Sequence, residues 1–367
     1  MSADRSGDPP AECPLARVLQ PFLDDGAPVV LAVSGGPDST ALMHAAAMSG
    51  RTGLFVATVD HRLRPESARE AERVGSAATR LGLPHATLVW SGSKPSTGIA
   101  AAARAARYRL LADHARSVGA GLVLTGHTRD DQAETVLMRL IAGSGPAGLA
   151  AMAPVRDLAP TVRLGRPFLT LPKADLVAYC EGHGLAYDHD PSNRDDRFGR
   201  ARLRRLMPHL AREGLTAERL CRLAQRSARD EAALALAGRA ALAAASVPGD
   251  GDLVLDGATL LALPEAVLLR VVGEALVRTG AGGAVRLERL ERLVLQDLVP
   301  AMRTGAAIRR TLAGILVSVT RQRAVTFGIA PARRTASQPL DGGLAAGPPD
   351  LLGKGGLAAY IGSACQD

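Results

Sequence analysis

The stretch Ser34-Gly35-Gly36-Pro37-Asp38-Ser39 decides the fold of this chain. It follows residues 29–33, an aliphatic and β-branched run that predicts a buried parallel strand. It precedes the Ala-rich residues 40–47, which predict a helix. The amides of such a turn and of the helix N-terminus point at an anion, and Gly35 and Gly36 let the backbone turn sharply and approach it closely. The stretch therefore predicts a phosphate cradle.

The polar side chains of the cradle indicate its ligand. Ser34 and Ser39 offer hydroxyl donors, and Asp38 would repel a phosphate unless a cation lay between them, so we interpret Asp38 as a Mg²⁺ contact. No Lys follows the glycines as a Walker A loop requires, and the dinucleotide fingerprint is absent. The alternative is a purely structural turn, in which Ser39 or Asp38 caps the helix.

Length and composition limit the possible number of domains and the possible classes of protein. The 367 residues favour two domains or more, and 47% hydrophobic residues are ample for a core. A net charge of +8 suggests a polyanionic partner, and only three of the 44 basic residues are lysines. The four cysteines are scattered, so neither a zinc site nor a disulfide framework is indicated and a cytoplasmic location is expected. We also expect no signal peptide and no membrane partner.

Strands and helices alternate through the first part of the chain. Strands are expected at 53–59, 86–90 and 122–125, and helices at 67–81, 98–118 and 131–141. This alternation predicts an α/β fold, with a parallel sheet covered by helices on both faces. The polar groups Ser34, Asp60, His61, Gly126 and His127 all follow strand ends, where such sheets bind ligands.

The segment 126–135, Gly-His-Thr-Arg-Asp-Asp-Gln-Ala-Glu-Thr, is a second constellation. The local interpretation is that Asp131 caps the helix and Glu134 reaches back to it. That interpretation leaves His127 and Asp130 unexplained, and both suit cation and phosphate handling opposite the cradle. We expect catalytic roles for Asp38, His127, Asp130 and Asp131, and a Mg²⁺ site at Asp38 and Asp130.

Other polar residues are assigned by position. Asp60 and His61 lie beside the cradle strand and are expected to meet the adenosine, although a simple turn is equally consistent. The expected ATP-binding residues are thus Ser34, Gly35, Gly36, Pro37, Asp38, Ser39, Asp60, His61 and Gly126. Arg104 and Arg107 share one helix face, which is either solvated or in contact with phosphates.

A basic run follows Asp190-Pro191-Ser192-Asn193. Residues 194–212 hold seven arginines against two aspartates, a one-sided excess that is unusual for a surface helix. Arginine forks pair with phosphates, and each neutralised phosphate adds affinity. The arginines expected to contact nucleic-acid phosphates, here and on the earlier helix, are Arg104, Arg107, Arg194, Arg197, Arg200, Arg202, Arg204 and Arg205.

In order and spacing these motifs resemble the tRNA(Ile)-lysidine synthetase family, within the PP-loop ATP pyrophosphatases. The motifs cover roughly residues 29–210 and include 60–64, 104–108 and 143–149. The resemblance implies that ATP activates C2 of the wobble cytidine in the CAU anticodon of tRNA(Ile), with Mg²⁺ as cofactor. Free L-lysine then displaces AMP. Neither the lysine-binding residues nor the oligomeric state follows from the sequence, and a homodimer stays open.

Three alternatives stay open. A tRNA thiolase of the same superfamily would need a persulfide cysteine or a cluster, which isolated cysteines do not supply. A synthetase linked to an amidotransferase would need a glutaminase domain or a source of ammonia. A non-catalytic basic RNA-binding protein would not need Asp38 or the 126–135 segment.

The domain organisation follows from a change of pattern near residue 215. Residues 1–215 are expected to form the ATP-binding catalytic domain. Residues 216–330 read as a mainly helical accessory domain that binds tRNA, with loose alternation at 311–328 that suggests a hairpin. Residues 331–367 are expected to form a flexible tail.

Overall fold

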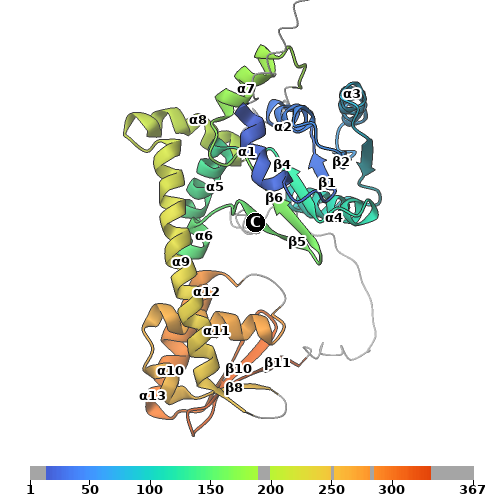
Figure 1. Ribbon diagram of the computed structural model, residues 1–367. Coiled ribbons are helices and arrows are strands. Elements are labelled where there is room, and N and C mark those ends of the chain that lie inside the picture. Colours follow the sequence, from blue (N-terminus) through green and yellow to red (C-terminus); the bar gives the residue numbers. More distant parts are fainter. Residues whose placement is uncertain (1–13, 189–198, 249–251, 282–284, 332–367) are drawn as a thin grey trace, which may run out of the picture.

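The computed structural model describes residues 14–188, 199–248, 252–281 and 285–331. The chain first builds a six-stranded sheet and then, beyond a long helix, a smaller five-stranded sheet (Figure 1). The expected tail, together with Arg194, Arg197 and the segment 190–193, lies outside these residues.

The first sheet has the order β3-β2-β1-β4-β6-β5. Its first four strands and β6 are parallel, and only β5, at the edge, is antiparallel. The strands are β1 (Val29–Ala32), β2 (Leu54–Asp60), β3 (His85–Val89), β4 (Leu122–Thr125), β5 (Val155–Ala159) and β6 (Val162–Gly165). The predicted α/β class is confirmed, whereas β5 and β6 lie where the sequence predicted no strand.

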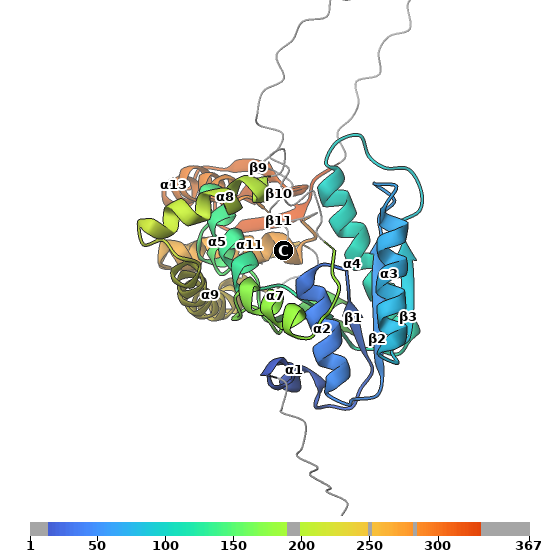
Figure 2. The same cartoon turned by 90° about the horizontal axis from the view of Figure 1, so that it is seen from above.

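Helices cover both faces of this sheet because alternate strand residues point to opposite sides. Val29 and Leu31 pack with α1, α2, α3 and α7, while Val30 and Ala32 pack against α4. Figure 2 shows α4 on the side opposite α1 and α2. The helices of this region are α1 (Pro14–Leu23), α2 (Pro37–Met48), α3 (Ser67–Arg80), α4 (Ile99–Ser117), α5 (Arg129–Ile141), α6 (Pro146–Leu149), α7 (Lys173–Gly182) and α8 (Gly199–Arg212).

The strand order creates a switch point between β1 and β4. The chain leaves β1 toward β2 on one side, and β4 joins β1 from the other side. The loops after β1 and β4 therefore diverge to opposite faces and leave a crevice at the carboxyl ends, where doubly wound sheets bind ligands. The cradle follows β1, and Gly126-His127 follows β4.

Helix α9 (Ala217–Ala245) links the two regions. Thr216 starts it by accepting a hydrogen bond from the Arg219 amide at 3.2 Å. The helix packs against α5 and α6 of the first region and against α11 of the second. Its buried side lies opposite an exposed row of arginines, Arg222, Arg226 and Arg229.

The second region is mainly helical, as expected, and also contains a sheet of order β7-β8-β11-β10-β9. The hairpin suggested by the loose alternation near 311–328 is present as β10 and β11, and β9 pairs with β10 as a third antiparallel strand. Its elements are β7 (Ser246–Val247), β8 (Leu253–Leu255), α10 (Gly257–Leu261), α11 (Glu265–Arg278), α12 (Leu287–Glu291), the π-helical η2 (Arg292–Leu298), α13 (Val299–Thr304), β9 (Ile308–Leu312), β10 (Ile315–Val319) and β11 (Val325–Ile329).

Among the described helices, none is both long enough and apolar enough to cross a membrane.

Candidate active site

The cradle begins where β1 ends and is held by its own hydroxyl groups. The Ser34 amide donates to Ser39 Oγ at 3.1 Å, and Ser39 Oγ donates to the Gly36 carbonyl at 3.0 Å. Gly35 has φ +90°, a conformation that side-chain-bearing residues rarely adopt, so glycine is required there. No side chain caps α2, which excludes the capping alternative for Ser39 and Asp38 and leaves the N-terminus open to an anion.

Gly126 brings the end of β4 against the start of α2. A Cβ at this position would lie 2.7 Å from the Asp38 carbonyl oxygen and 3.1 Å from the Ser39 nitrogen, so no other residue fits. This contact explains the glycine sterically. It also places His127, the next residue, beside the cradle, as the strand-end argument predicts.

Asp38 is mostly buried in the first turn of α2, with 17% of its side chain exposed. Its Oδ2 pairs with the ammonium of Lys173 on α7. Its Oδ1 is buried and has no hydrogen-bond partner in the described part of the chain. Burial raises the pKa of Asp38, an effect that Lys173 opposes and Asp131 reinforces. A buried carboxylate oxygen without a donor fits a site for a cation.

Asp130 and Asp131, at the start of α5, accept hydrogen bonds from two different segments. Asp130 Oδ2 accepts from the Lys173 amide at 2.7 Å and so fixes the beginning of α7. Asp131 Oδ2 accepts from the Thr128 amide and hydroxyl, both at 2.8 Å. The capping box is therefore Thr128 with Asp131, not Asp131 with Glu134 as the local interpretation proposed.

His127 and Asp131 form an electrostatic pair. Burial lowers the pKa of His127 to about 3, against the pull of Asp131. Although burial alone would raise the pKa of Asp131, His127 and the Thr128 donors lower it overall. At neutral pH the imidazole is thus neutral and weakly basic, with Nδ1 2.8 Å from Thr125 Oγ1. His127 suits polar contact with a ligand better than it suits storing a proton.

Asp60 and His61 lie at the end of β2, as expected. Asp60 Oδ1 accepts from the Arg62 amide at 2.8 Å and from Ser67 Oγ at 2.6 Å, so the carboxylate organises the turn into α3. His61 stacks edge-on against Trp90, with ring centroids 6.0 Å apart. Burial, followed by Arg107, lowers its pKa.

The predicted arginines occupy different surroundings. Arg107 acts electrostatically on both His61 and His127, and Arg104 acts on His127, so both lie near the strand-end site. Arg104 also lies over the Tyr108 ring at 5.0 Å. Arg202 and Arg205 are exposed on α8. Arg204 points inward, and of Arg200 only its backbone is described.

Arg204 makes a two-pronged ion pair with Glu134 of α5. Its Nε donates to Glu134 Oε1 at 2.6 Å, and its Nη2 donates to Oε2 at 3.1 Å. Only 4% of the Glu134 side chain is exposed, against 37% for Arg204. This pair joins α8 to α5 across 70 residues of sequence.

Sequence reasoning missed several polar residues at the site. Lys173 is one, although the Leu-Pro-Lys sequence in a chain with three lysines was a usable signal. Arg166, at the end of β6, is 1% exposed and donates to the Ala153 carbonyl at 2.7 Å. Asp188 lies over the cradle, because its amide donates to the Gly35 carbonyl at 2.8 Å and its carboxylate pairs with Arg73.

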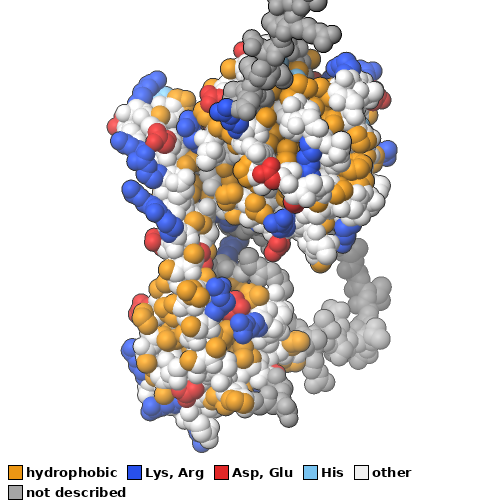
Figure 3. Space-filling view, viewed as in Figure 1, with side chains coloured by type: hydrophobic (Ala, Val, Ile, Leu, Met, Phe, Trp, Pro, Cys, Tyr) orange, Lys and Arg blue, Asp and Glu red, His pale blue; other side chains and the backbone are white. Residues whose placement is uncertain are grey.

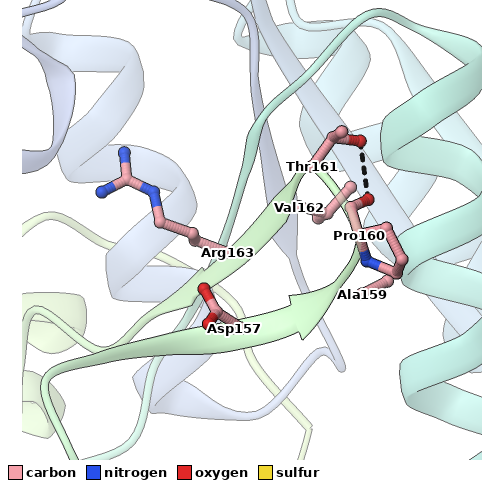
Figure 4. Close-up of a pocket in the computed structure, with 6 residues that line it drawn as sticks. All are labelled: Asp157, Ala159, Pro160, Thr161, Val162 and Arg163. Atoms are coloured by element: carbon pink, nitrogen blue, oxygen red, sulfur yellow. Dashed lines mark hydrogen bonds between the residues drawn. The ribbon is translucent and has the colours of Figure 1, made fainter. Parts of the chain in front are cut away.

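A surface hollow of 570 Å³ lies elsewhere, at the β5–β6 turn (Figure 4). It is lined by Asp157, Ala159, Pro160, Thr161, Val162 and Arg163. Val162 is the first residue of β6, which runs parallel to β4, so the hollow lies at the amino edge of the sheet. The cradle lies at the carboxyl edge, and the hollow is therefore not part of the site.

Cradle, switch point and polar strand ends together define an ATP-binding enzyme of the PP-loop class. Residues 10–210 match the family model described as the PP-loop domain. This match covers more than half of the chain and confirms the predicted class.

Relatives of similar sequence show to which family within the PP-loop class the chain belongs. A tRNA(Ile)-lysidine synthase from Methylobacterium sp. (strain 4-46) is 56% identical over 328 residues, which are 87% of this chain and 95% of that protein. One from Methylobacterium nodulans is 57% identical over 312 residues, or 83% and 92% of the two chains. One from Bradyrhizobium sp. (strain BTAi1) is 46% identical over 360 residues, or 91% and 99%. The chain belongs to the tRNA(Ile)-lysidine synthase family.

Proposed function

We propose that this protein joins L-lysine to C2 of the wobble cytidine in the CAU anticodon of tRNA(Ile), at the expense of ATP. The identity to tRNA(Ile)-lysidine synthases along nearly the whole chain carries this proposal. The cytidine O2 attacks the α-phosphate and pyrophosphate leaves. An amine of lysine then attacks C2, and AMP departs with the former O2. The product, lysidine, changes the codon read from AUG to AUA, and the reaction belongs in the cytoplasm.

The residues of the cradle perform the first step. Amides at the start of α2, including that of Ser39, and the Ser34 hydroxyl bind phosphate oxygens, while the Ser39 hydroxyl holds the turn through the Gly36 carbonyl. Asp38 and Asp130 are the residues proposed to hold Mg²⁺, which when bound supplies positive charge against the departing pyrophosphate. No group of three or more metal-ligating side chains forms in the described residues, which suits Mg²⁺ because that ion usually takes one or two carboxylates and substrate phosphates.

The test is a reaction with purified protein, ATP, Mg²⁺, L-lysine and tRNA(Ile) carrying the CAU anticodon. We expect AMP and pyrophosphate in equal amounts and one lysine added to the wobble nucleotide, detected by mass spectrometry after nuclease digestion. A transcript with uridine at the wobble position is the matched control and should remain unmodified. Incorporation of sulfur, or binding of tRNA without consumption of ATP, would replace this proposal by the thiolase or the binding protein.

The exposed arginines of α8 and α9 are the proposed tRNA surface. Arg202, Arg205, His209 and Arg212 share one side of α8, and the buried Leu203 lies on the other side. The row Arg222, Arg226 and Arg229 continues on α9, and Figure 3 shows basic side chains along this edge of the molecule. Arginine at helical spacing on an exposed face is suited to successive phosphates.

Salt dependence tests this surface. Each phosphate contact contributes a slope of roughly −0.7 to −0.9 in a log–log plot of tRNA affinity against salt. Replacing Arg202 and Arg205 with Ala should flatten the slope by about one for each contact made, with ATP affinity unchanged. The control replaces Arg69 and Arg80 on α3, which is far from α8 (Figure 1). Equal slopes for the two double variants would exclude α8 from the surface.

We also propose that residues 1–215 and 216–330 are two domains, catalytic and tRNA-binding. Each region has its own sheet and its own apolar cluster, and Thr216 starts the connecting helix.

A further inference from the structure

Lys173 is held at the cradle by its backbone. Pro172 precedes it in an extended conformation, and Asp130 Oδ2 accepts from its amide at 2.7 Å. Farther along α7, Tyr179 Oη lies 2.8 Å from His44 Nδ1, and the Cys180 thiol is 3.4 Å from the Pro37 carbonyl. Because these contacts fix α7 to α2, the Lys173 Cα has one position beside the first turn of α2.

The Lys173 side chain, in contrast, keeps conformational freedom about its own bonds. It is 37% exposed, and four rotatable bonds separate its ammonium from the fixed backbone. The ammonium pairs with Asp38 Oδ2, while the buried Asp38 Oδ1 receives no hydrogen bond from any described residue. The lysine is thus a movable positive charge beside the carboxylate proposed for Mg²⁺.

The choice of lysine at this position is itself informative. Only three of the chain's 44 basic residues are lysines. A compact ammonium on a flexible stem turns readily from one anion to another, whereas a guanidinium is larger and prefers a fixed planar partner.

We propose that Lys173 is the counter-ion of Asp38 before ATP binds and a phosphate ligand afterwards, so that the divalent cation enters with the nucleotide and not before it. This inference rests on the proposed ATP and Mg²⁺ site. A monovalent and a divalent cation side by side on one carboxylate repel each other, so the ammonium must leave Asp38 when the metal arrives. The nearest new anions are the phosphates in the cradle, which attract it away.

Two binding measurements without turnover test the inference. Mn²⁺ serves as a paramagnetic probe of the metal site without nucleotide, and calorimetry with a non-hydrolysable ATP analogue measures nucleotide affinity. Lys173→Met should bind Mn²⁺ alone about tenfold more tightly than the wild type and the ATP analogue about tenfold more weakly. Lys173→Arg keeps the charge and should bind the analogue within about threefold of the wild type.

Arg80→Met on α3 is the matched control for the loss of one exposed positive charge, and neither affinity should change. Lys173→Gln repeats the test, with thermal melting to show that the variants fold. Unchanged Mn²⁺ and nucleotide affinities in both neutral variants would overturn the inference. A wild type that binds neither Mn²⁺ with the analogue nor the analogue alone would instead overturn the proposed ATP site.

Discussion

The two sheet regions of this molecule bury different kinds of residue. All the buried polar and charged side chains of the described residues lie between Ser39 and Ser227, and several of them, including Thr125, Thr128 and Glu134, lie at the carboxyl edge of the first sheet. The core of the second region, from Leu242 to Phe327, is apolar throughout its described buried positions. Burying a polar group costs free energy unless it is hydrogen-bonded, so such groups gather where chemistry needs them. The contrast supports the proposed division into a catalytic first region and a tRNA-binding second region.

The largest expected effects come from replacing two buried phenylalanines, one in each region. These substitutions test whether the two regions unfold as separate units. Phe168 belongs to the first core and Phe327 to the second, and both are fully buried. Each change to Ala should lower the free energy of unfolding by about 3–5 kcal/mol. Trp90, the only tryptophan, reports the first region, so urea unfolding followed by its fluorescence should shift for Phe168→Ala alone.

ATP affinity is a second measurement on the two phenylalanine variants. We expect Phe168→Ala to weaken it and Phe327→Ala to leave it unchanged. Loss of nucleotide binding in Phe327→Ala would mean that the second core also supports the cradle.

Asp38→Asn tests the polar side of the comparison. The carboxamide keeps the shape of the side chain but loses the charge that holds a divalent cation, so turnover should fall at least a hundredfold, about 2.7 kcal/mol of transition-state stabilisation. Asp175→Asn, on the exposed first turn of α7, is the matched control and should remain fully active. Pyrophosphate release at saturating ATP and Mg²⁺ measures the effect, and near-normal turnover of Asp38→Asn would remove the residue from the metal site.

Adjacent arginines on α8 give a smaller and sharper contrast. Arg204→Ala removes the two-pronged ion pair with the buried Glu134 and should cost about 2 kcal/mol of stability, at the low end for a buried pair because Arg204 is partly exposed. Arg205→Ala, on the exposed side, should change stability by less than about 0.5 kcal/mol. The midpoints of urea unfolding of the two variants measure the difference. Equal midpoints would show that the ion pair with Glu134 does not hold α8 to α5.

The smallest effect is expected at the thiols. Burial raises the pKa of both Cys180 and Cys221 to about 11, so the reactive thiolate is scarce at neutral pH and grows only as the pH rises toward that value. Replacing both with Ala should leave lysine incorporation within about threefold, and alkylation of the native protein at pH 7 should be slow. A folded double variant without activity would point to a catalytic thiol and revive the thiolase alternative.

Local sequence patterns predicted four of the six strands of the first sheet, and with them the edge at which the candidate site lies. Short aliphatic runs such as Val29–Ala32 and Leu122–Thr125 mark buried strands through local composition alone. Once the strands are parallel, their carboxyl ends share one edge, so the cradle and Gly126-His127 had to meet. The sequence did not predict β5 because it is an edge strand with Arg156 and Asp157 within it, and it did not predict β6 because that strand has four residues and Arg163 interrupts its apolar run.

Which charged side chains form ion pairs depends on the tertiary packing and does not follow from the sequence pattern. Asp38 meets Lys173 across 135 residues, and Glu134 meets Arg204 across 70, distances at which no periodicity in the sequence relates the two partners. These contacts depend on how α7 and α8 pack on α2 and α5, which many side chains determine together. The sequence therefore predicts which groups bind phosphate, and packing determines which charged side chain lies next to each of them.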